Sequence, residues 1–472
     1  MVKKTIRLNI HRNKLLGLIL AVTLISILTI SGAAQTPTQA EGPTYIVQRG
    51  DTLNEIAIRF GVSTEDIIAV NGLDNPNTLF IGQPIIIPGL EGISGILTSE
   101  ILPIGTSLTG LVRQNRLEQN DLVKLNRLTS PSELIAGVSF ILPLREDQDQ
   151  LTQLASPAPS GTTLETSIQS GISPWVLLED NQLRGTWDLL PGENLFTRLT
   201  ASDDTNDQPG IFTISLNSLP IVQGETMQVT VSGSNLLEIS GSFNGQTLNF
   251  FSEDDQLFTG LHGVHAMTDP GVYALEINAR DAAGAPVNFN QLVLVSPGFY
   301  GTQMVYVSTE FLNDDVIEDE DAYLNPILDR LTPQKQWEGR FQYPIDEPCV
   351  NSPFGLRRIY NDGLLFFYHT GVDFAVCASN LNIYAPAAGE VILAEELTVR
   401  GKAILIDHGW GVISGYWHLS EFNVAVGDWV QPGDVLGLIG NTGRSAGPHL
   451  HFEVLINGTP VNPQTWLDQA FP

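Results

Sequence analysis

Two stretches decide the fold of this chain: His369-Thr-Gly-Val-Asp373 and, much further along, His449-Leu-His451-Phe-Glu-Val-Leu-Ile456. The second stretch alternates as a β-strand does, so His449 and His451 are expected to share one face of a sheet. Together the stretches supply two nitrogens and one oxygen suited to zinc. Three protein ligands leave a fourth tetrahedral position open, which is the arrangement of catalytic zinc sites.

A further histidine and a turn belong to the same pattern. His418 lies in the β-favouring run Gly415-Tyr-Trp-His-Leu419 and offers an imidazole for acid–base catalysis or for stabilising an oxyanion. The run Gly443-Arg-Ser-Ala-Gly-Pro448 is typical of turns and directly precedes the second stretch. We therefore expect the turn to position the histidines of that stretch in a groove on one face of an antiparallel sheet.

These motifs carry a family resemblance. Residues from about Ser352 to Trp466 resemble the lysostaphin-type (LytM-like) zinc endopeptidases, which include murein DD-endopeptidases and cut peptidoglycan peptides. The matching motifs are Ser352-Pro-Phe-Gly355, the HxxxD element, the Tyr-x-His-Leu element and Gly447-Pro-His-Leu-His-Phe-Glu453. The resemblance implies that zinc is bound by His369, Asp373 and His451. It also implies that His449 and His418 flank the metal, one as general base and one as transition-state stabiliser.

Other polar residues near the motifs have simpler interpretations. His408 is expected to be structural or to support a ligand, as a lone histidine in a strand usually is. Asp407 and Glu453 are expected to orient backbone groups or a ligand imidazole, because ligating histidines usually have such partners. Three residues could either line the substrate groove or pack in the core: Tyr368, Tyr416 and Arg357.

An internal repeat occupies the N-terminal part. Residues 44–53 predict a strand and turn, Asn54 to Phe60 a helix, Ser63 the cap of a second helix, and residues 85–88 a closing strand. This βααβ unit resembles the LysM module, which binds glycans containing N-acetylglucosamine. The pattern recurs at an offset of 55 and, more weakly, near 110. The later copies carry substitutions, so the first copy is expected to be the best glycan binder, with the others as binders or spacers.

The remaining segments predict a β-domain and a linker. Short β-runs between residues 211 and 296 suggest an immunoglobulin-like sandwich. His262 and His265 with Asp269 could suggest a second metal site, but the glycine and turn between them favour a loop. The acidic run Glu318-Asp-Glu-Asp321 lacks the spaced ligands of a calcium loop and is expected to be a solvated face. A short helix is expected from Leu324 to Leu331.

The predicted architecture is therefore multidomain and mainly β. Its expected parts are a signal peptide or signal anchor at 1–40, a LysM at 44–89, a LysM-like copy at 99–144, a degenerate copy at 155–202, a β-sandwich at 207–298, an acidic linker at 299–345, and an antiparallel β metallopeptidase domain at 346–468.

The N-terminus, the charge and the cysteines bear on location. Residues 1–40 contain no acidic residues and five basic residues, all of which precede an apolar run; this pattern predicts export, with an uncleaved membrane anchor as the alternative. The rest of the chain then has 18 basic and 52 acidic residues, a net charge of −34, which disfavours binding to nucleic acid and anionic lipid.

Cys349 and Cys377 flank the HxxxD element, and export permits oxidation, so we predict a disulfide between them, with two buried thiols as the alternative.

The sequence thus predicts an exported, extracellular or envelope zinc endopeptidase that hydrolyses peptidoglycan stem peptides or cross-bridges and is held on glycan by LysM modules. A bound zinc ion would polarise the scissile carbonyl and lower the pKa of its water. The alternative is a non-catalytic wall-binding regulator of another hydrolase. A purely structural adhesin would leave the five histidine and aspartate positions unexplained.

Overall fold

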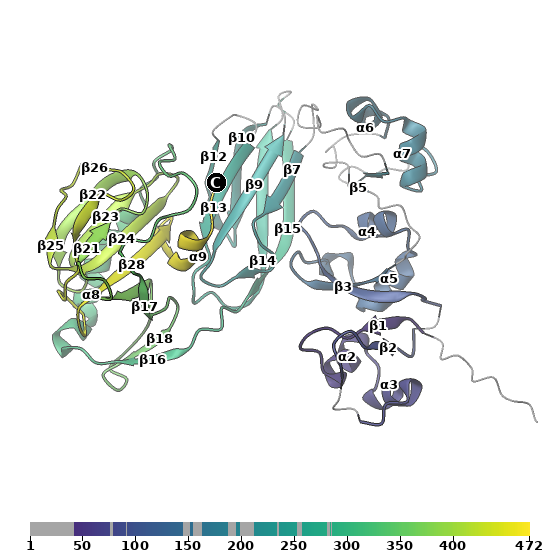
Figure 1. Ribbon diagram of the computed structural model, residues 1–472. Coiled ribbons are helices and arrows are strands. Elements are labelled where there is room, and N and C mark those ends of the chain that lie inside the picture. The colour runs from purple at the N-terminus through teal and green to yellow at the C-terminus, as the bar shows by residue number, and fades with distance from the viewer. Residues whose placement is uncertain are drawn as a thin grey trace, which may run out of the picture. The chain divides into compact units, whose positions relative to one another are not determined.

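The computed structural model describes residues 42–75, 79–90, 92–144, 152–153, 163–186, 195–198, 212–233, 236–252, 257–280, 284 and 286–472. The predicted signal peptide or anchor lies outside these residues. No helix within the described ranges is both apolar enough and long enough to cross a membrane. The described residues divide into two compact units: those up to Thr98 with Pro143 and Leu144, and the rest (Figure 1).

The first repeat copy folds as its sequence predicts. It consists of β1 (Thr44–Ile46), α2 (Leu53–Phe60), α3 (Thr64–Asn71) and β2 (Pro84–Ile86), with β1 and β2 antiparallel. Thr52 and Glu55 form a reciprocal capping box that begins α2, and Gly61 ends it in the left-handed conformation. Ser63 caps α3, as predicted.

The later copies repeat these elements. The second contains β3 (Ile96–Ile101), α4 (Leu108–Asn115), α5 (Gln119–Asn126), the 3₁₀ turn η1 (Pro131–Glu133) and β4 (Ser139–Leu144). The third contains β5 (Thr152–Gln153), α6 (Thr163–Ser170), α7 (Pro174–Asp180) and β6 (Phe196–Thr197).

One asparagine holds each copy together. The side chain of Asn71 accepts from the backbone N–H of Ile86 at 2.7 Å and donates to its carbonyl at 2.8 Å. Asn126 makes the same pair of bonds with Ile141, and Asn181 with Phe196, at equal distances. Each asparagine thus ties the second helix to the closing strand. The same pair of structural hydrogen bonds therefore recurs in all three copies.

A two-sheet domain follows. One sheet has the order β11-β10-β14-β15-β8 and the other β12-β13-β9-β7, and a common apolar core lies between them. The strands are β7 (Phe212–Leu216), β8 (Ile221–Val222), β9 (Thr226–Gly233), β10 (Leu237–Phe243), β11 (Gln246–Leu248), β12 (Phe250–Ser252), β13 (Leu257–Gly263), β14 (Gly271–Arg280) and β15 (Pro286–Ser296). The immunoglobulin-like class of this domain stays a prediction.

The C-terminal region is built on an antiparallel sheet ordered β17-β20-β28-β24-β23-β22-β26, with β29 also paired to β28 (Figure 1). Its strands are β17 (Cys349–Ser352), β20 (Val372–Ala375), β22 (Gly389–Leu397), β23 (Gly401–Asp407), β24 (Val412–Leu419), β26 (Trp429–Val430), β28 (His449–Ile456) and β29 (Thr459–Val461). A second sheet contains β21 (Asn382–Tyr384), β27 (Val435–Leu438) and β25 (Glu421–Phe422), and α9 (Pro463–Asp468) closes the chain.

The two faces of the large sheet differ. Phe452 and Val454 of β28 belong to the main apolar core, which Trp337, Phe341 and Trp466 help to close. The opposite face carries a smaller cluster that includes Leu455 and Trp417. The polar residues of β28 lie on this second face, because side chains alternate along a strand.

The segment expected as an acidic linker contains ordered elements. β16 (Thr302–Val305) pairs in parallel with β18 (Arg357–Tyr360), which pairs with β19 (Leu365–Tyr368). After the 3₁₀ turn η3 (Thr309–Leu312), helix α8 runs over Asp314–Leu328. The helix begins ten residues before the predicted start, because Asn313 caps it and the acidic residues complement the positive end of the helix dipole. The acidic run is therefore part of a helix, and Glu320 within it is buried rather than solvated.

The predicted disulfide is confirmed, since Cys349 is bonded to Cys377. Cys349 begins β17, which pairs with β20, the strand that carries Asp373. The bond closes a 28-residue separation around the HxxxD element. It therefore constrains the segment that supplies His369 and Asp373.

Candidate active site

Neighbouring strands bring the polar residues together. Asp373 of β20 and His451 of β28 are directly opposite each other in the antiparallel register. Side chains at such positions share a face, with Cβ atoms about 5 Å apart. His369 lies just before β20, where its backbone N–H donates to Leu356 and its carbonyl accepts from Gly355. The sheet register therefore places all three on one side.

These three residues form a compact group of ligand atoms. His369 Nε2 lies 2.9 Å from Asp373 Oδ1 and 3.0 Å from His451 Nδ1, and the His451 Nδ1–Asp373 Oδ1 distance is 2.8 Å. All three residues are buried. Among the described residues, this is the one group of histidines, cysteines and carboxylates with metal-binding geometry.

Hydrogen bonds behind the group fix which atoms face its centre. His369 Nδ1 is 2.8 Å from the Pro353 carbonyl, and His451 Nε2 is 2.9 Å from a Glu453 carboxylate oxygen. A carbonyl or carboxylate oxygen only accepts, so each of these nitrogens carries the proton. His369 Nε2 and His451 Nδ1 therefore present lone pairs to each other and to a carboxylate. A group of three acceptors at this spacing fits a cation, and tetrahedral zinc would require ligand separations of roughly 3.3 Å.

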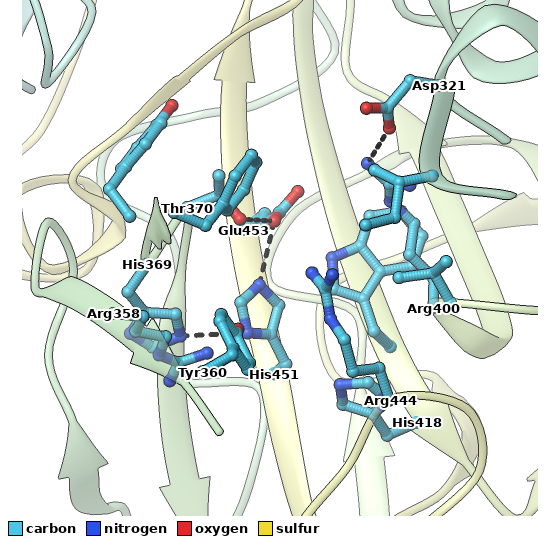
Figure 2. Close-up of a pocket in the computed structure, with 15 residues that line it drawn as sticks. Asp321, Arg358, Tyr360, His369, Thr370, Arg400, His418, Arg444, His451 and Glu453 are labelled. Atoms are coloured by element: carbon cyan, nitrogen blue, oxygen red, sulfur yellow. Dashed lines mark hydrogen bonds and ion pairs between the residues drawn. The ribbon is translucent and has the colours of Figure 1, made fainter. Parts of the chain in front are cut away.

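Arg358 completes the support of Asp373. Its guanidinium forms an ion pair with Asp373 Oδ2 and also donates to Ser352 Oγ at 3.0 Å. Oδ2 is thereby occupied, and Oδ1 remains directed at the two histidines. Glu453 is held in turn by the hydroxyl of Thr370 (Figure 2). Both carboxylates thus have fixed orientations before a metal arrives.

The other two predicted histidines flank this group. His449 Nδ1 donates to the Gly447 carbonyl at 2.7 Å, and its Nε2 lies 3.5 Å from Asp373 Oδ1. His418 Nδ1 donates to the Thr442 carbonyl at 2.7 Å, and its ring centre is 5.0 Å from that of His449. Both rings therefore carry the proton on Nδ1, which leaves Nε2 as the atom for chemistry.

A β-bulge explains how His418 reaches the site. Between β23 and β24 the register shifts, so that Lys402 pairs with Leu419 while Ile404 pairs with Tyr416. His418 has a φ of 68°, a left-handed conformation that is uncommon outside glycine. Simple alternation would place His418 on the same face as Tyr416, in the main core. The bulge turns it to the opposite face instead, a known use of bulges beside active sites.

Burial and hydrogen bonds shift the pKa values of the site residues. Burial lowers the pKa of His369 to about 4 and also lowers the pKa values of His418 and His449. Burial acts in the same direction on His451, but hydrogen bonds to Asp373 and Glu453 raise its pKa. Burial would raise the pKa of Glu453, yet the hydrogen bond from His451 and nearby cations lower it to about 2. At neutral pH the site therefore contains ionised carboxylates and mostly neutral imidazoles.

The remaining sequence candidates lie elsewhere or play other parts. His408 is fully buried between the Ala388 carbonyl and Ser414 Oγ, outside the site. Asp407 accepts from the backbone of Gly409 and supports the main chain. Tyr416 is buried in the main core. Tyr368 lines the pocket next to the histidines, and its hydroxyl is 3.0 Å from His265 Nε2.

Sequence reasoning missed the arginines at the pocket and the approach of the N-terminal part of α8 to it. The pocket that contains His369, His418 and His451 is also lined by Arg358, Arg400, Arg444 and Asp321 of α8 (Figure 2). One signal was available: these arginines belong to only 23 basic residues in the chain and lie beside the recognised motifs. No comparable feature of the sequence indicates that α8 lies beside the pocket, because its position depends on tertiary packing.

Comparison with known proteins assigns this region. Residues 367–463 match the sequence profile of peptidase family M23, and residues 45–88 match that of the LysM domain. The chain carries an M23 peptidase domain and a LysM domain. The M23 match includes all five candidate site residues but begins after Arg358 and α8.

Relatives share the M23 region. The DD-carboxypeptidase/endopeptidase Mpg of Neisseria meningitidis is 43% identical over 122 residues, 25% of this chain and 27% of the relative. The peptidoglycan DD-endopeptidase ShyA of Vibrio cholerae is 36% identical over 122 residues, 26% of this chain and 28% of the relative. The catalytic domain of lysostaphin from Staphylococcus simulans is 30% identical, with a TM-score of 0.21, covering 29% of this chain and 92% of that structure. The chain thus matches little more than a quarter of the length of the curated relatives.

Proposed function

We propose that this protein is a zinc-dependent endopeptidase that hydrolyses peptide bonds of peptidoglycan. The observation that carries the proposal is the buried triangle of His369 Nε2, Asp373 Oδ1 and His451 Nδ1, with edges of 2.8 to 3.0 Å and every atom able to bind a metal ion. The M23 domain supplies the reaction class, and the names of Mpg and ShyA supply the substrate class. These three residues would hold zinc, which supplies Lewis-acid activation of the scissile carbonyl and of a water.

The two flanking histidines would move the protons. Each keeps its proton on Nδ1 through a backbone carbonyl, so its Nε2 can accept a proton from the attacking water. The histidine that accepts this proton becomes an imidazolium, which can donate to the leaving amine. The other histidine would stabilise the tetrahedral oxyanion in its protonated form, by donating from Nε2. His449 and His418 remain alternatives for these two roles.

The other parts of the chain would bring the enzyme to its substrate. The LysM domain would bind N-acetylglucosamine-containing glycan, and the second and third copies would add avidity or act as spacers. In this division of work, the immunoglobulin-like two-sheet domain would act as the spacer between glycan binding and hydrolysis. Such a substrate implies export to the envelope or the cell exterior.

The test uses the purified full chain, its metal content and peptide release from purified peptidoglycan. We expect about one zinc per chain and release that a chelator abolishes and zinc restores. His449→Ala should keep its zinc and lose at least 10³-fold in release, because the general base or stabiliser is gone. Arg340→Met, which changes an exposed residue outside this pocket, is the control. Release by His449→Ala within a few-fold of the parent would refute the assignment, and zinc without any release would favour a non-catalytic regulator.

A further inference from the structure

Three arginines line the pocket that contains the candidate metal ligands. Arg358, Arg400 and Arg444 lie around the same space as His369 and His451 (Figure 2). The chain as a whole is strongly acidic, with 52 acidic and 23 basic residues. A cluster of guanidinium groups at one pocket therefore sets this place apart from the rest of the protein.

Two of these arginines are neutralised within the protein. Arg358 forms an ion pair with Asp373. Arg400 forms ion pairs of 2.9 Å with both Glu320 and Asp321 of α8. Neither guanidinium has a charge left over for a ligand unless one of these pairs opens.

Arg444 differs from the other two. Within the described part of the chain, its guanidinium has no ion pair, and its Nη1 is buried without a hydrogen-bond partner. The guanidinium carbon lies 5.1 Å from the ring centre of Tyr360 and 5.9 Å from that of Phe367. Its backbone N–H donates to the Val399 carbonyl at 2.8 Å, which anchors the loop. Arg444 is thus fixed in place by its backbone and by two aromatic rings, but its guanidinium has no anionic partner among the described residues.

A second donor in the same pocket also lacks a partner. Trp417 is 3% exposed, lines the pocket, and its Nε1 has no hydrogen-bond partner among the described residues. A buried donor without a partner costs about 1–3 kcal/mol, so two of them in one pocket point to a ligand that supplies acceptors. A carboxylate suits Arg444 in particular, because its two oxygens match the guanidinium fork and it carries the opposite charge.

We propose that Arg444 forms a subsite for a carboxylate group of the substrate peptide, with Trp417 Nε1 as a further unpartnered donor in the same pocket. This inference rests on the proposed peptidase function and makes it more specific. Because Arg444 and Trp417 line the same pocket as His369, His418 and His451, the carboxylate belongs to a residue at or next to the scissile bond. Arg444 is thereby a specificity-determining residue that favours anionic over amidated peptides.

The experiment compares two forms of one substrate, a cross-linked stem-peptide dimer with its carboxyl groups either free or converted to methylamides. The full-length, zinc-loaded protein is used as parent, as Arg444→Met, and as Arg340→Met. Methionine retains an unbranched stem of similar reach, and Arg340 is an exposed arginine that provides the matched loss of charge. Thermal unfolding of each variant checks that the fold is kept.

We expect the parent to prefer the free acid by about 10- to 100-fold in kcat/KM, as for a hydrogen bond between charged groups. Arg444→Met should remove this preference, lowering kcat/KM for the acid by that factor while the amide changes less than threefold. Arg340→Met should match the parent. In the His449→Ala background, which blocks turnover, adding Arg444→Met should raise the Kd for the acid dimer by a similar factor in calorimetry.

The outcomes separate the two proposals. If the parent hydrolyses neither dimer, the peptidase function fails, and the calorimetric comparison still decides the subsite. If the parent hydrolyses both dimers equally, or if Arg444→Met loses the same factor on both, Arg444 has a structural role and the subsite proposal is wrong. Equal Kd values for the acid dimer with and without Arg444 would also overturn it.

Discussion

The two faces of the large C-terminal sheet are made by the same strands but have different side chains: one face is apolar and packed, and the other holds the polar residues of the candidate site. Phe452 lies in the main apolar core, with its ring 5.5 Å from that of Tyr416, whereas its neighbours His451 and Glu453 point to the other side. The core face is made of side chains that need only to pack. The site face has charged and polar groups, each oriented by a particular partner. One face of the strand therefore contributes mainly to the unfolding free energy and the other to the candidate site. Substitutions at adjacent positions should affect these two properties separately.

The largest effect is expected at His451. In His451→Gln, the side-chain amide can still donate to Glu453 as Nε2 does, but the ligand atom Nδ1 is lost. We expect zinc content to fall below about 0.1 per chain and peptide release to fall by at least 10³-fold. The unfolding free energy of the metal-free protein should change by less than about 1.5 kcal/mol. Metal analysis and urea titration measure the two quantities, and full zinc occupancy in this variant would contradict the ligand assignment.

The adjacent residue should give the reverse result. Phe452→Ala removes a fully buried ring from the main core, which costs about 3–5 kcal/mol in unfolding free energy. The ligand atoms are untouched, so the folded fraction should still bind about one zinc per chain. Urea titration of the metal-free protein followed by metal analysis at low temperature tests both points. A larger loss of zinc than of fold would show that the two faces are coupled.

A smaller effect should distinguish His408, a polar residue on the apolar side. Burial lowers its pKa to about 4, from about 6.5 in the unfolded chain. The unfolded state therefore binds more protons between these values, so stability is full above pH 6.5 and falls as pH drops towards 4. Replacing His408 with Asn keeps a donor for the Ala388 carbonyl and removes the titration. Between pH 7 and 4, the parent should lose about 3 kcal/mol more than this variant in metal-free urea titrations, and parallel pH profiles would contradict this.

Residue type and spacing were enough to predict much of the site. The alternation of His449-Leu-His451 placed the strand, and the motifs located every member of the cluster. The bulge at His418 could not be predicted, because β-favouring residues alternate through Tyr-Trp-His-Leu and the left-handed φ depends on pairing with β23. The hydrogen bonds of the three asparagines to a strand 15 residues later could not be predicted either, because they form only in the folded unit.

Helix α8 determines where a fragment that contains the M23 domain must begin. Its buried Glu320 accepts hydrogen bonds from the backbone N–H groups of Val399 and Arg400. The backbone N–H of Arg444 in turn donates to the Val399 carbonyl. The M23 match starts 39 residues after α8 ends, at residue 367. A fragment trimmed to 346–472 would keep every candidate zinc ligand yet lose α8, which supports the wall of the pocket. The smallest autonomous enzyme is therefore expected to start upstream of Asn313, and at Thr302 if β16 is to be kept.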